Sequence, residues 1–252
     1  MDRPRESTAE SSALVRLEEV SLSFGSVSVL EDLSLSVPAD AVTAVIGPNG
    51  SGKTTLLEIV AGVLAADAGD RAVRAEGERP IGYLPQDPRF RPQFSVEETL
   101  RYYAGLLEAD VDVEASMRQV GLTAVRDRSV GGLSGGMRRL LGIAQSLLGD
   151  PQVVVLDEPT SGLDPRMRAD VFETVTGLPD AETGVIISSH DLAAVERTDN
   201  VVLIAGGSVR LSGSPADLVA EGGASSLDEA YLEAVPRSAM IRAGTDAGGE
   251  SS

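Results

Sequence analysis

A short glycine-rich segment between an apolar run and a helical pattern constrains this chain more than any other feature. Residues 41–46 form the apolar run and predict a strand, and residues 56–60 predict the start of a helix. The segment between them follows the pattern GxxxxGK[ST] and consists of Gly47, Pro48, Asn49, Gly50, Ser51, Gly52, Lys53, Thr54 and Thr55. A strand, a loop of this pattern and a helix together predict a phosphate-binding site.

Each residue type in this segment has its own part in binding phosphate. Glycines let the loop curl until backbone N–H groups point at a phosphate, and the new helix adds its positive amino end. Lys53 supplies a point charge, and the Thr54 hydroxyl is placed to ligate Mg²⁺. A turn without a ligand would need neither of them. Among 21 Lys and Arg residues Lys53 is the single lysine, and the two types are not interchangeable at a phosphate.

Length and composition narrow the class of protein. With 252 residues, 42% of them hydrophobic, we expect one α/β domain with a real core. The chain has no cysteine, which excludes disulfides and thiolate metal sites. Residues 1–12 lack the apolar stretch of a secretory signal, and no apolar run approaches the roughly 18 residues that span a bilayer. We therefore expect a soluble protein, or one held at a membrane by a partner.

The formal net charge of -18 limits which partners the protein can bind. Such a field repels phosphate backbones, and aromatic residues make up only 3% of the chain, so we expect no nucleic acid as a partner. Nucleotide binding remains compatible because it depends on local dipoles, one lysine and Mg²⁺. An acid excess combined with Arg in place of Lys favours a halophilic protein, in which salt screens the self-repulsion. Simple solubility is the other interpretation.

Hydrophobic periodicity and turn residues predict alternating strands and helices. We expect strands at residues 14–24, 27–37, 41–46, 71–75, 81–84, 153–156, 184–188, 201–205 and 209–211. We expect helices after Thr55, at 95–107 with a capping box of Ser95 and Glu98, at 111–120 and 138–148, after Asp164 and Ser214, and at 226–235. The helical run between the strands looks like an insertion beside the sheet. Residues 1–13 and 236–252 are predicted to be disordered.

Polar side chains follow several of the predicted strands. Asp157 ends a fully apolar strand and is expected to hold Mg²⁺, and Glu158 beside it can take a proton from an attacking water. Two acids that merely cap a strand would not explain both of them downstream of a phosphate loop. His190, the only histidine, and Gln86 also follow strands, at the edge where doubly wound sheets bind ligands. We expect His190 at the outer phosphate and Gln86 at Mg²⁺ or the water.

Phe24 lies at the end of a predicted strand upstream of the phosphate loop. Its aromatic face could stack on an adenine, or it could pack in the core. The residues alone leave both interpretations open.

Taken together, these motifs resemble the ATP-binding subunit of an ABC transporter over roughly residues 14–235. The glycine-rich segment matches Walker A, Gln86 the Q-loop, His190 the switch histidine, and Phe24 the adenine-stacking aromatic. The remaining motifs are the signature (Leu133, Ser134, Gly135, Gly136 and Met137), Walker B (153–158) and the D-loop (Ser161, Gly162, Leu163 and Asp164). A phosphate loop alone is shared by many NTPases, whereas this order and spacing is specific.

The resemblance implies an α/β P-loop NTPase with a RecA-like core sheet, an antiparallel β subdomain and a helical signature subdomain. The helical subdomain would span about residues 87–149 of an ATPase domain at 14–235. The cofactors implied are ATP and Mg²⁺, with Thr54, Gln86 and Asp157 at the metal. A second subunit, expected as a homodimer, would receive backbone N–H groups from Ser134, Gly135 and Gly136, and Asp164 would also lie at the nucleotide. Met137 replaces the commoner Gln, and we expect activity to survive.

The resemblance also implies a partner in the membrane. We expect an ATPase that drives transport through an integral membrane permease, located at the cytoplasmic face of the cell membrane. Residues 135–151 and 226–232 look like those of ABC-2 exporters, which favours export. The alternative is a soluble, non-transport ABC ATPase in cofactor or metal-centre assembly. An ATP-binding regulatory module without turnover is a third class, and Glu158 and His190 together argue against it.

Overall fold

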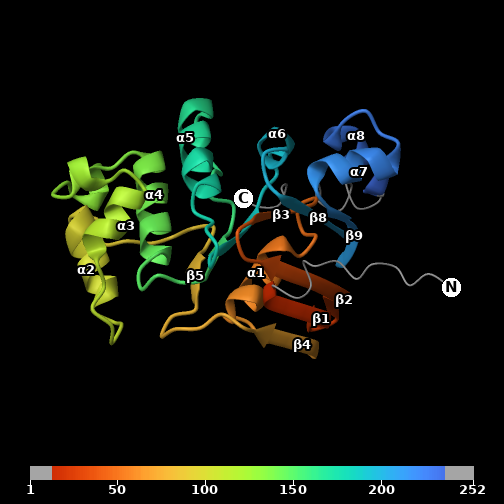
Figure 1. The fold of residues 1–252 in the computed structure, drawn as a ribbon, viewed down its shortest axis with the longest axis horizontal. Coiled ribbons are helices and arrows are strands. Elements are labelled where there is room, and N and C mark those ends of the chain that lie inside the picture. The colour runs from red at the N-terminus through yellow and green to blue at the C-terminus, as the bar shows by residue number, and fades with distance from the viewer. Residues whose placement is uncertain (1–12, 236–252) are drawn as a thin grey trace, which may run out of the picture.

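The computed structural model describes residues 13–235, which form two sheets and the helices around them (Figure 1). The strands are β1 (Ala13–Phe24), β2 (Val27–Pro38), β3 (Val42–Ile46), β4 (Ala68–Val73), β5 (Ile81–Leu84), β6 (Val153–Leu156), β7 (Gly184–Ser188), β8 (Asn200–Ala205) and β9 (Ser208–Gly213). The helices are α1 (Lys53–Ala61), α2 (Val96–Ala104), α3 (Val113–Gln119), α4 (Gly135–Ser146), α5 (Pro165–Thr176), α6 (Leu192–Val195), α7 (Pro215–Gly222) and α8 (Leu227–Ala234), with 3₁₀ turns at Thr123–Val125 and Val130–Gly132.

The larger sheet has the strand order β5-β6-β7-β3-β8-β9, and the predicted α/β fold is confirmed. Strands β5, β6, β7, β3 and β8 run parallel, and β9 is antiparallel to β8. Every residue of β3, β6 and β7 is buried, as expected for parallel strands covered on both faces. The carboxyl ends of the parallel strands therefore meet at one edge, where a doubly wound sheet binds its ligands.

The alternation along these strands divides the interior into two cores. Ala44 and Ile187 face one core, which includes residues of α2 to α8. Val45 and Ile186 face the other core, which includes α1 and the smaller sheet. Because successive strand side chains point to opposite faces, one sheet serves both cores.

The smaller sheet is antiparallel, with the order β2-β1-β4. Strand β4 was predicted at 71–75 but begins at Ala68, so the predicted boundaries were wrong. Its first residues, Ala68 and Gly69, have low strand propensity, and pairing with β1 from Ser21 to Val15 gives them extended structure. Gly69 is required there: with φ +85°, an added Cβ would lie 2.4 Å from the carbonyl oxygen of Glu19.

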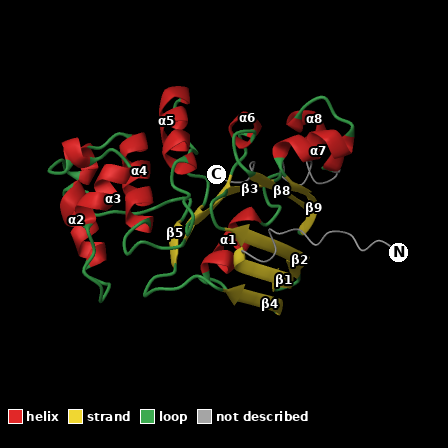
Figure 2. Cartoon of the chain, viewed as in Figure 1, coloured by secondary structure: helices red, strands yellow, loops and turns green. Residues whose placement is uncertain are grey.

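Helices α2, α3 and α4 lie together at one end of the molecule, away from the smaller sheet (Figure 2). The predicted capping box begins α2: Ser95 Oγ accepts from Glu98 N, and the Glu98 carboxylate accepts from Ser95 N. Helix α4 begins at Gly135, before the predicted residue 138, because Ser134 Oγ accepts from Met137 N and caps it. Helix α2 ends at Ala104, and Leu107 lies beyond it.

The carboxyl end of α4 is held against β5 and the segment before it. Arg79 Nη1 donates to the carbonyl oxygens of Gln145 (2.9 Å) and Leu148 (3.0 Å). Gly82 of β5 lies so close that an added Cβ would be 1.9 Å from the Ser146 carbonyl oxygen. A side chain at position 82 would therefore push this helix end away from the sheet.

At the amino end, Ala13 belongs to β1, so its predicted place in a disordered segment was wrong. The rest of that prediction, residues 1–12, and the predicted disorder of 236–252 lie outside the described residues. Short helix α6 was not predicted. Within residues 13–235, no helix has both the length and the apolar character needed to cross a membrane.

Candidate active site

A cavity of about 760 Å³ opens at the carboxyl edge of the parallel strands. The loops after β3, β5, β6 and β7 all contribute to it. Its lining residues are Val29, Asn49, Gly50, Gly52, Lys53, Thr54, Thr55, Gln86, Glu158, Ser161 and His190. The structure thus brings together four segments that the sequence predicted to meet.

The glycine-rich loop has the backbone that a phosphate cradle requires. Gly47 has φ +154°, and an added Cβ would lie 2.1 Å from the carbonyl oxygen of Ile204 in β8. Gly52 has φ +98° and precedes the first residue of α1. Since L side chains rarely adopt such angles, glycine is required at both positions. The loop leaves the amino end of α1 directed at the cavity, where backbone N–H groups favour an anion.

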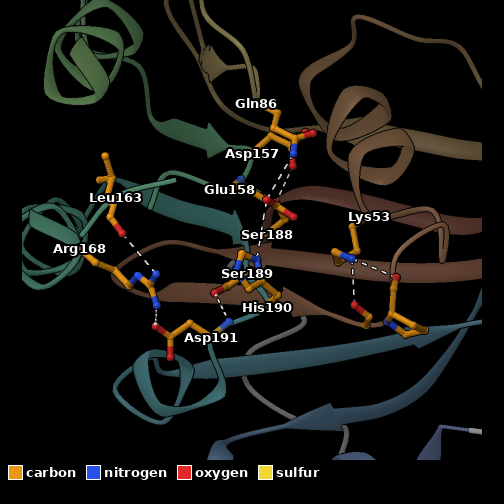
Figure 3. Close-up of polar contacts among 12 residues, drawn as sticks. Lys53, Gln86, Asp157, Glu158, Leu163, Arg168, Ser188, Ser189, His190 and Asp191 are labelled. Atoms are coloured by element: carbon orange, nitrogen blue, oxygen red, sulfur yellow. Dashed lines mark hydrogen bonds and ion pairs between the residues drawn. The ribbon is translucent and has the colours of Figure 1, made fainter. Parts of the chain in front are cut away.

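Lys53 is buried and folded back on its own loop. Its Nζ donates to the carbonyl oxygens of Gly47 (2.9 Å) and Pro48 (3.1 Å), as Figure 3 shows. Burial lowers the pKa of Lys53, while the negative charges of Glu158 and Asp157 raise it in part. A cation partly desolvated in this way interacts strongly with a phosphate.

The acid pair after β6 is fixed by a serine that the sequence analysis missed. Ser188 Oγ donates to Asp157 Oδ1 and accepts from the backbone N–H of Glu158 (2.8 Å). Glu158 has φ +45°, a left-handed conformation that a residue other than glycine adopts at a cost. The hydrogen bond that the Glu158 N–H donates to Ser188 Oγ holds this strained turn, and Glu158 lines the cavity.

Two predicted residues contact the Glu158 carboxylate (Figure 3). Gln86 Nε2 donates to Oε2 over 3.3 Å, and His190 Nδ1 lies 3.7 Å from the same oxygen. Glu158 is largely shielded, with 14% of its side chain exposed, whereas His190 is 54% exposed. A carboxylate held between an amide and an imidazole can accept a proton from a water in the cavity.

The residues present fit a magnesium ion bound with a nucleotide. Asp157 is 1% exposed, and its Oδ2 has no hydrogen-bond partner, which is costly unless a cation or its water satisfies it. Thr54, whose side chain carries a hydroxyl, lines the cavity, whereas Asp157 is not a lining residue but the buried neighbour of Glu158, which is one. The described residues contain no group of three or more His, Cys, Asp or Glu side chains suited to a metal. Mg²⁺ bound with a nucleotide usually takes one or two protein ligands, and phosphate oxygens and water would complete its coordination.

Other predicted site residues do not line this cavity. Phe24 is 54% exposed at the end of β1, so the core-packing interpretation was wrong. Ser134, Gly135 and Gly136 begin α4, and Asp164 caps α5 through bonds to Arg166 N and Met167 N. Gly136 packs instead on α5, because an added Cβ would lie 2.0 Å from Met167 Cε.

Comparisons with known proteins agree with this geometry. The family model described as "ABC transporter" matches residues 30–161. A zinc import ATP-binding protein of Pseudomonas fluorescens, ZnuC, is 38% identical over 209 residues, which cover 81% of this chain and 78% of the relative. The Nod factor export ATP-binding protein I of Cupriavidus pinatubonensis is 32% identical, with 82% of this chain and 68% of the relative covered.

Solved structures share the fold. A structure described as the ATP-binding subunit of an ABC transporter has a TM-score of 0.76 at 26% identity, with 88% of this chain and 99% of that chain covered. The structure of cbiO1 from Clostridium perfringens, described as part of the ABC transporter complex cbiONQ, has a TM-score of 0.73 at 26% identity, with coverage of 83% and 92%.

Proposed function

Because the chain belongs to the ABC transporter family as an ATP-binding subunit, we propose that it drives transport through a separate integral membrane permease. The chain is an ATPase that binds ATP with Mg²⁺. Its place would be the cytoplasmic face of the membrane, where it is held by the permease. The description of cbiO1 as part of a multi-protein transporter complex supports such a partner.

Within one chain, the proposed roles follow from the contacts in the cavity. Lys53 and the glycine-rich loop would bind the phosphates, and Thr54, Asp157 and Gln86 would hold Mg²⁺. When bound there, Mg²⁺ would supply positive charge against the charge that develops on the phosphate oxygens. Glu158 orients the attacking water and accepts its proton at Oε2, the oxygen nearest to Gln86 and His190. His190 contacts the outer phosphate.

The position of Ser134 and Gly135, in the signature motif, supports a site built from two chains. Ser134 and Gly135 are exposed at the amino end of α4 but lie outside their own chain's cavity. A helix amino end with free N–H groups binds an anion, so a second copy could receive it at its nucleotide. We therefore propose a homodimer around two MgATP, with Ser134, Gly135, Gly136 and Asp164 contributed across the interface, and Phe24 stacked on the adenine.

For the direction of transport, the proposal is export. The likeness of residues 135–151 and 226–232 to ABC-2 exporters favours export, and a relative named for Nod factor export supports it. The relative named for zinc import is more similar, at 38% identity, and supports import as the second candidate. A soluble ABC ATPase in cofactor or metal-centre assembly is the alternative class. Copurification from detergent-solubilised native membranes distinguishes it, because only a transport subunit brings an integral membrane protein with it.

The experiment on the two-chain site uses lesions in different halves of it. Glu158→Gln should keep ATP affinity while turnover falls roughly 10²–10⁴-fold, the loss typical of a general base. With hydrolysis blocked, size-exclusion chromatography should give a dimer with MgATP and a monomer without it. Ser134→Arg should bind ATP but neither dimerise nor hydrolyse it.

Mixing provides the complementary test. A heterodimer of Ser134→Arg and Lys53→Ala chains has one composite site without a lesion, so some ATPase activity should return. Neither variant alone should have any. If Glu158→Gln stays monomeric at saturating MgATP, and mixing restores nothing, the two-chain site is refuted for the isolated subunit.

A further inference from the structure

The first turn of α5 carries an arginine that touches two loops of the site without lining the cavity. Arg168 Nη1 lies 3.2 Å from Asp191 Oδ2, and Nη2 donates to the carbonyl oxygen of Leu163 over 3.3 Å (Figure 3). One planar guanidinium therefore joins the loop after β7 to the loop after β6. Lysine could not make both contacts at this geometry, because it presents a point charge and not a fork.

Asp191 is the residue that follows His190, and its other contacts are local. Its Oδ1 accepts from Ala194 N (3.2 Å) and caps α6, and its own N–H donates to Ser189 Oγ (3.0 Å). Oδ2 is left for Arg168. The backbone on both sides of His190 is therefore held, and the position of the imidazole 3.7 Å from Glu158 depends on that loop.

Leu163 belongs to the second loop that Arg168 holds. The same loop contains Ser161, which lines the cavity. The Ser161 N–H donates to the carbonyl oxygen of Glu158 (3.1 Å). On the other side of the turn, Met167 packs on Gly136 of the signature helix. The amino end of α5 thus contacts three segments: the loop of His190 and Asp191, the segment that follows Glu158, and Gly136 at the start of α4.

The exposure of the Arg168–Asp191 ion pair indicates that it positions the two loops and adds little to the stability of the fold. The side chains of Arg168 and Asp191 are 37% and 23% exposed, and partly exposed ion pairs contribute little to folding. A fork that fixes two loops can still have a large effect on turnover, because small displacements of catalytic groups are costly.

We propose that Arg168 is a positioning residue for hydrolysis. It acts on His190 through Asp191 and on the Ser161 loop through the Leu163 carbonyl, and it has no part in binding ATP. The inference rests on the proposed roles of Glu158 and His190.

The kinetic test replaces Arg168 and compares it with a neighbour. Arg168→Ala should lower kcat about 10- to 100-fold, with the MgATP dissociation constant changed less than about twofold. Arg168→Lys should recover part of the loss. The matched control is Arg166→Ala, which removes the same charge from an exposed position on the same helix turn and should leave kcat unchanged. Thermal melts of all variants should be alike.

A double-mutant cycle isolates the contact with Asp191. Asp191→Asn keeps an oxygen that can cap α6 but removes the charge that faces Arg168. If the two residues act as one unit, Arg168→Ala with Asp191→Asn should have a kcat no lower than Arg168→Ala alone. Additive losses would overturn the proposal, as would an equal loss in Arg166→Ala.

A readout independent of activity uses the single histidine of the chain. In untagged protein, the NMR signals of one imidazole report on His190 without assignment. Arg168→Ala should shift or broaden them, and Arg166→Ala should not. Unchanged His190 signals in Arg168→Ala overturn the proposal even if the ATPase is low. If Glu158→Gln retains full turnover, it is the proposed catalytic site that fails, and this spectrum still decides whether Arg168 positions the loop.

Discussion

Arg139 of the signature helix donates a hydrogen bond to the backbone carbonyl oxygen of Gln86 over 2.9 Å. Arg139 is 9% exposed, and burial lowers its pKa while Asp157 and Glu158 raise it in part. Gln86 in turn donates its side-chain amide to Glu158. The helix that begins with the signature turn is therefore connected to the proposed catalytic carboxylate through two consecutive hydrogen bonds.

Removing the Arg139 guanidinium should cost stability. Arg139→Met keeps the apolar stem but leaves the Gln86 carbonyl without its donor, and we expect a loss of about 1–3 kcal/mol in the free energy of unfolding. Urea denaturation measures it. Arg138→Met is the matched control, because Arg138 is exposed on the same helix and should change stability little. Equal effects of the two substitutions would contradict this account.

Lys53→Ala should weaken MgATP binding by about 100-fold or more, because a partly desolvated cation at the phosphates is lost. Isothermal titration calorimetry measures the affinity. Lys53→Arg tests the geometry: it keeps the charge but replaces a compact ammonium with a planar fork, so binding should remain impaired. An affinity within about threefold of the wild type in Lys53→Ala would remove Lys53 from the site.

Acid should selectively remove the contribution of Glu97 to stability. Hydrogen bonds from Arg126 and Arg101 hold the pKa of the Glu97 carboxyl at about 2, below its ordinary value of 4.5. Since the folded-state pKa is the lower one, the stabilisation is complete above about pH 4.5 and disappears as the pH falls toward 2. The difference in unfolding free energy between wild type and Glu97→Gln should therefore shrink over that range. Arg126→Met should remove most of this pH dependence; a difference that persists at pH 2 would be the contrary result.

The net charge of -18 predicts a dependence on salt. If the acid excess is a halophilic adaptation, the melting temperature should rise from low to molar KCl, well beyond about 0.15 M, where the Debye length is already about 8 Å. Thermal melts in a KCl series, with the ATPase measured in parallel, are the test. A melting temperature that is flat or falls with KCl would refute the halophilic interpretation alone.

The buried parallel strands were predicted best from the sequence. The all-apolar run Val153–Leu156 and the run Gly184–Ser188 were correct to the residue, because a strand buried on both faces needs apolar side chains throughout. Strand β4 was predicted poorly, because Ala68 and Gly69 become extended only through pairing with β1. Propensity cannot report a partner strand that lies far away in the sequence.

Some residues of the candidate site could likewise be predicted from the sequence, and others could not. Lys53, Gln86, Glu158 and His190 were predicted because glycine turns and strand ends mark them locally, and the structure brings them to one cavity. Ser188 was missed because it continues an apolar strand and its hydroxyl has a purpose only beside the acid pair. Arg139 and Arg168 were missed because a charged residue on a helix is usually solvated, and only the fold reveals what it contacts.

The close approach of Gly82 to the Ser146 carbonyl oxygen and the hydrogen bonds donated by Arg79 fix the carboxyl end of α4 against the sheet, so any tilt of the helix would turn about this end. The helix has 12 residues and is therefore about 18 Å long. A tilt of about 10° about this end would move Ser134, at the amino end that packs on α5, by about 3 Å, and Arg139, near the middle, by about half as much. A displacement of Ser134 would therefore also displace Arg139 and, through its hydrogen bond, Gln86. The position of Gln86 beside Glu158 would thus depend on what Ser134 contacts.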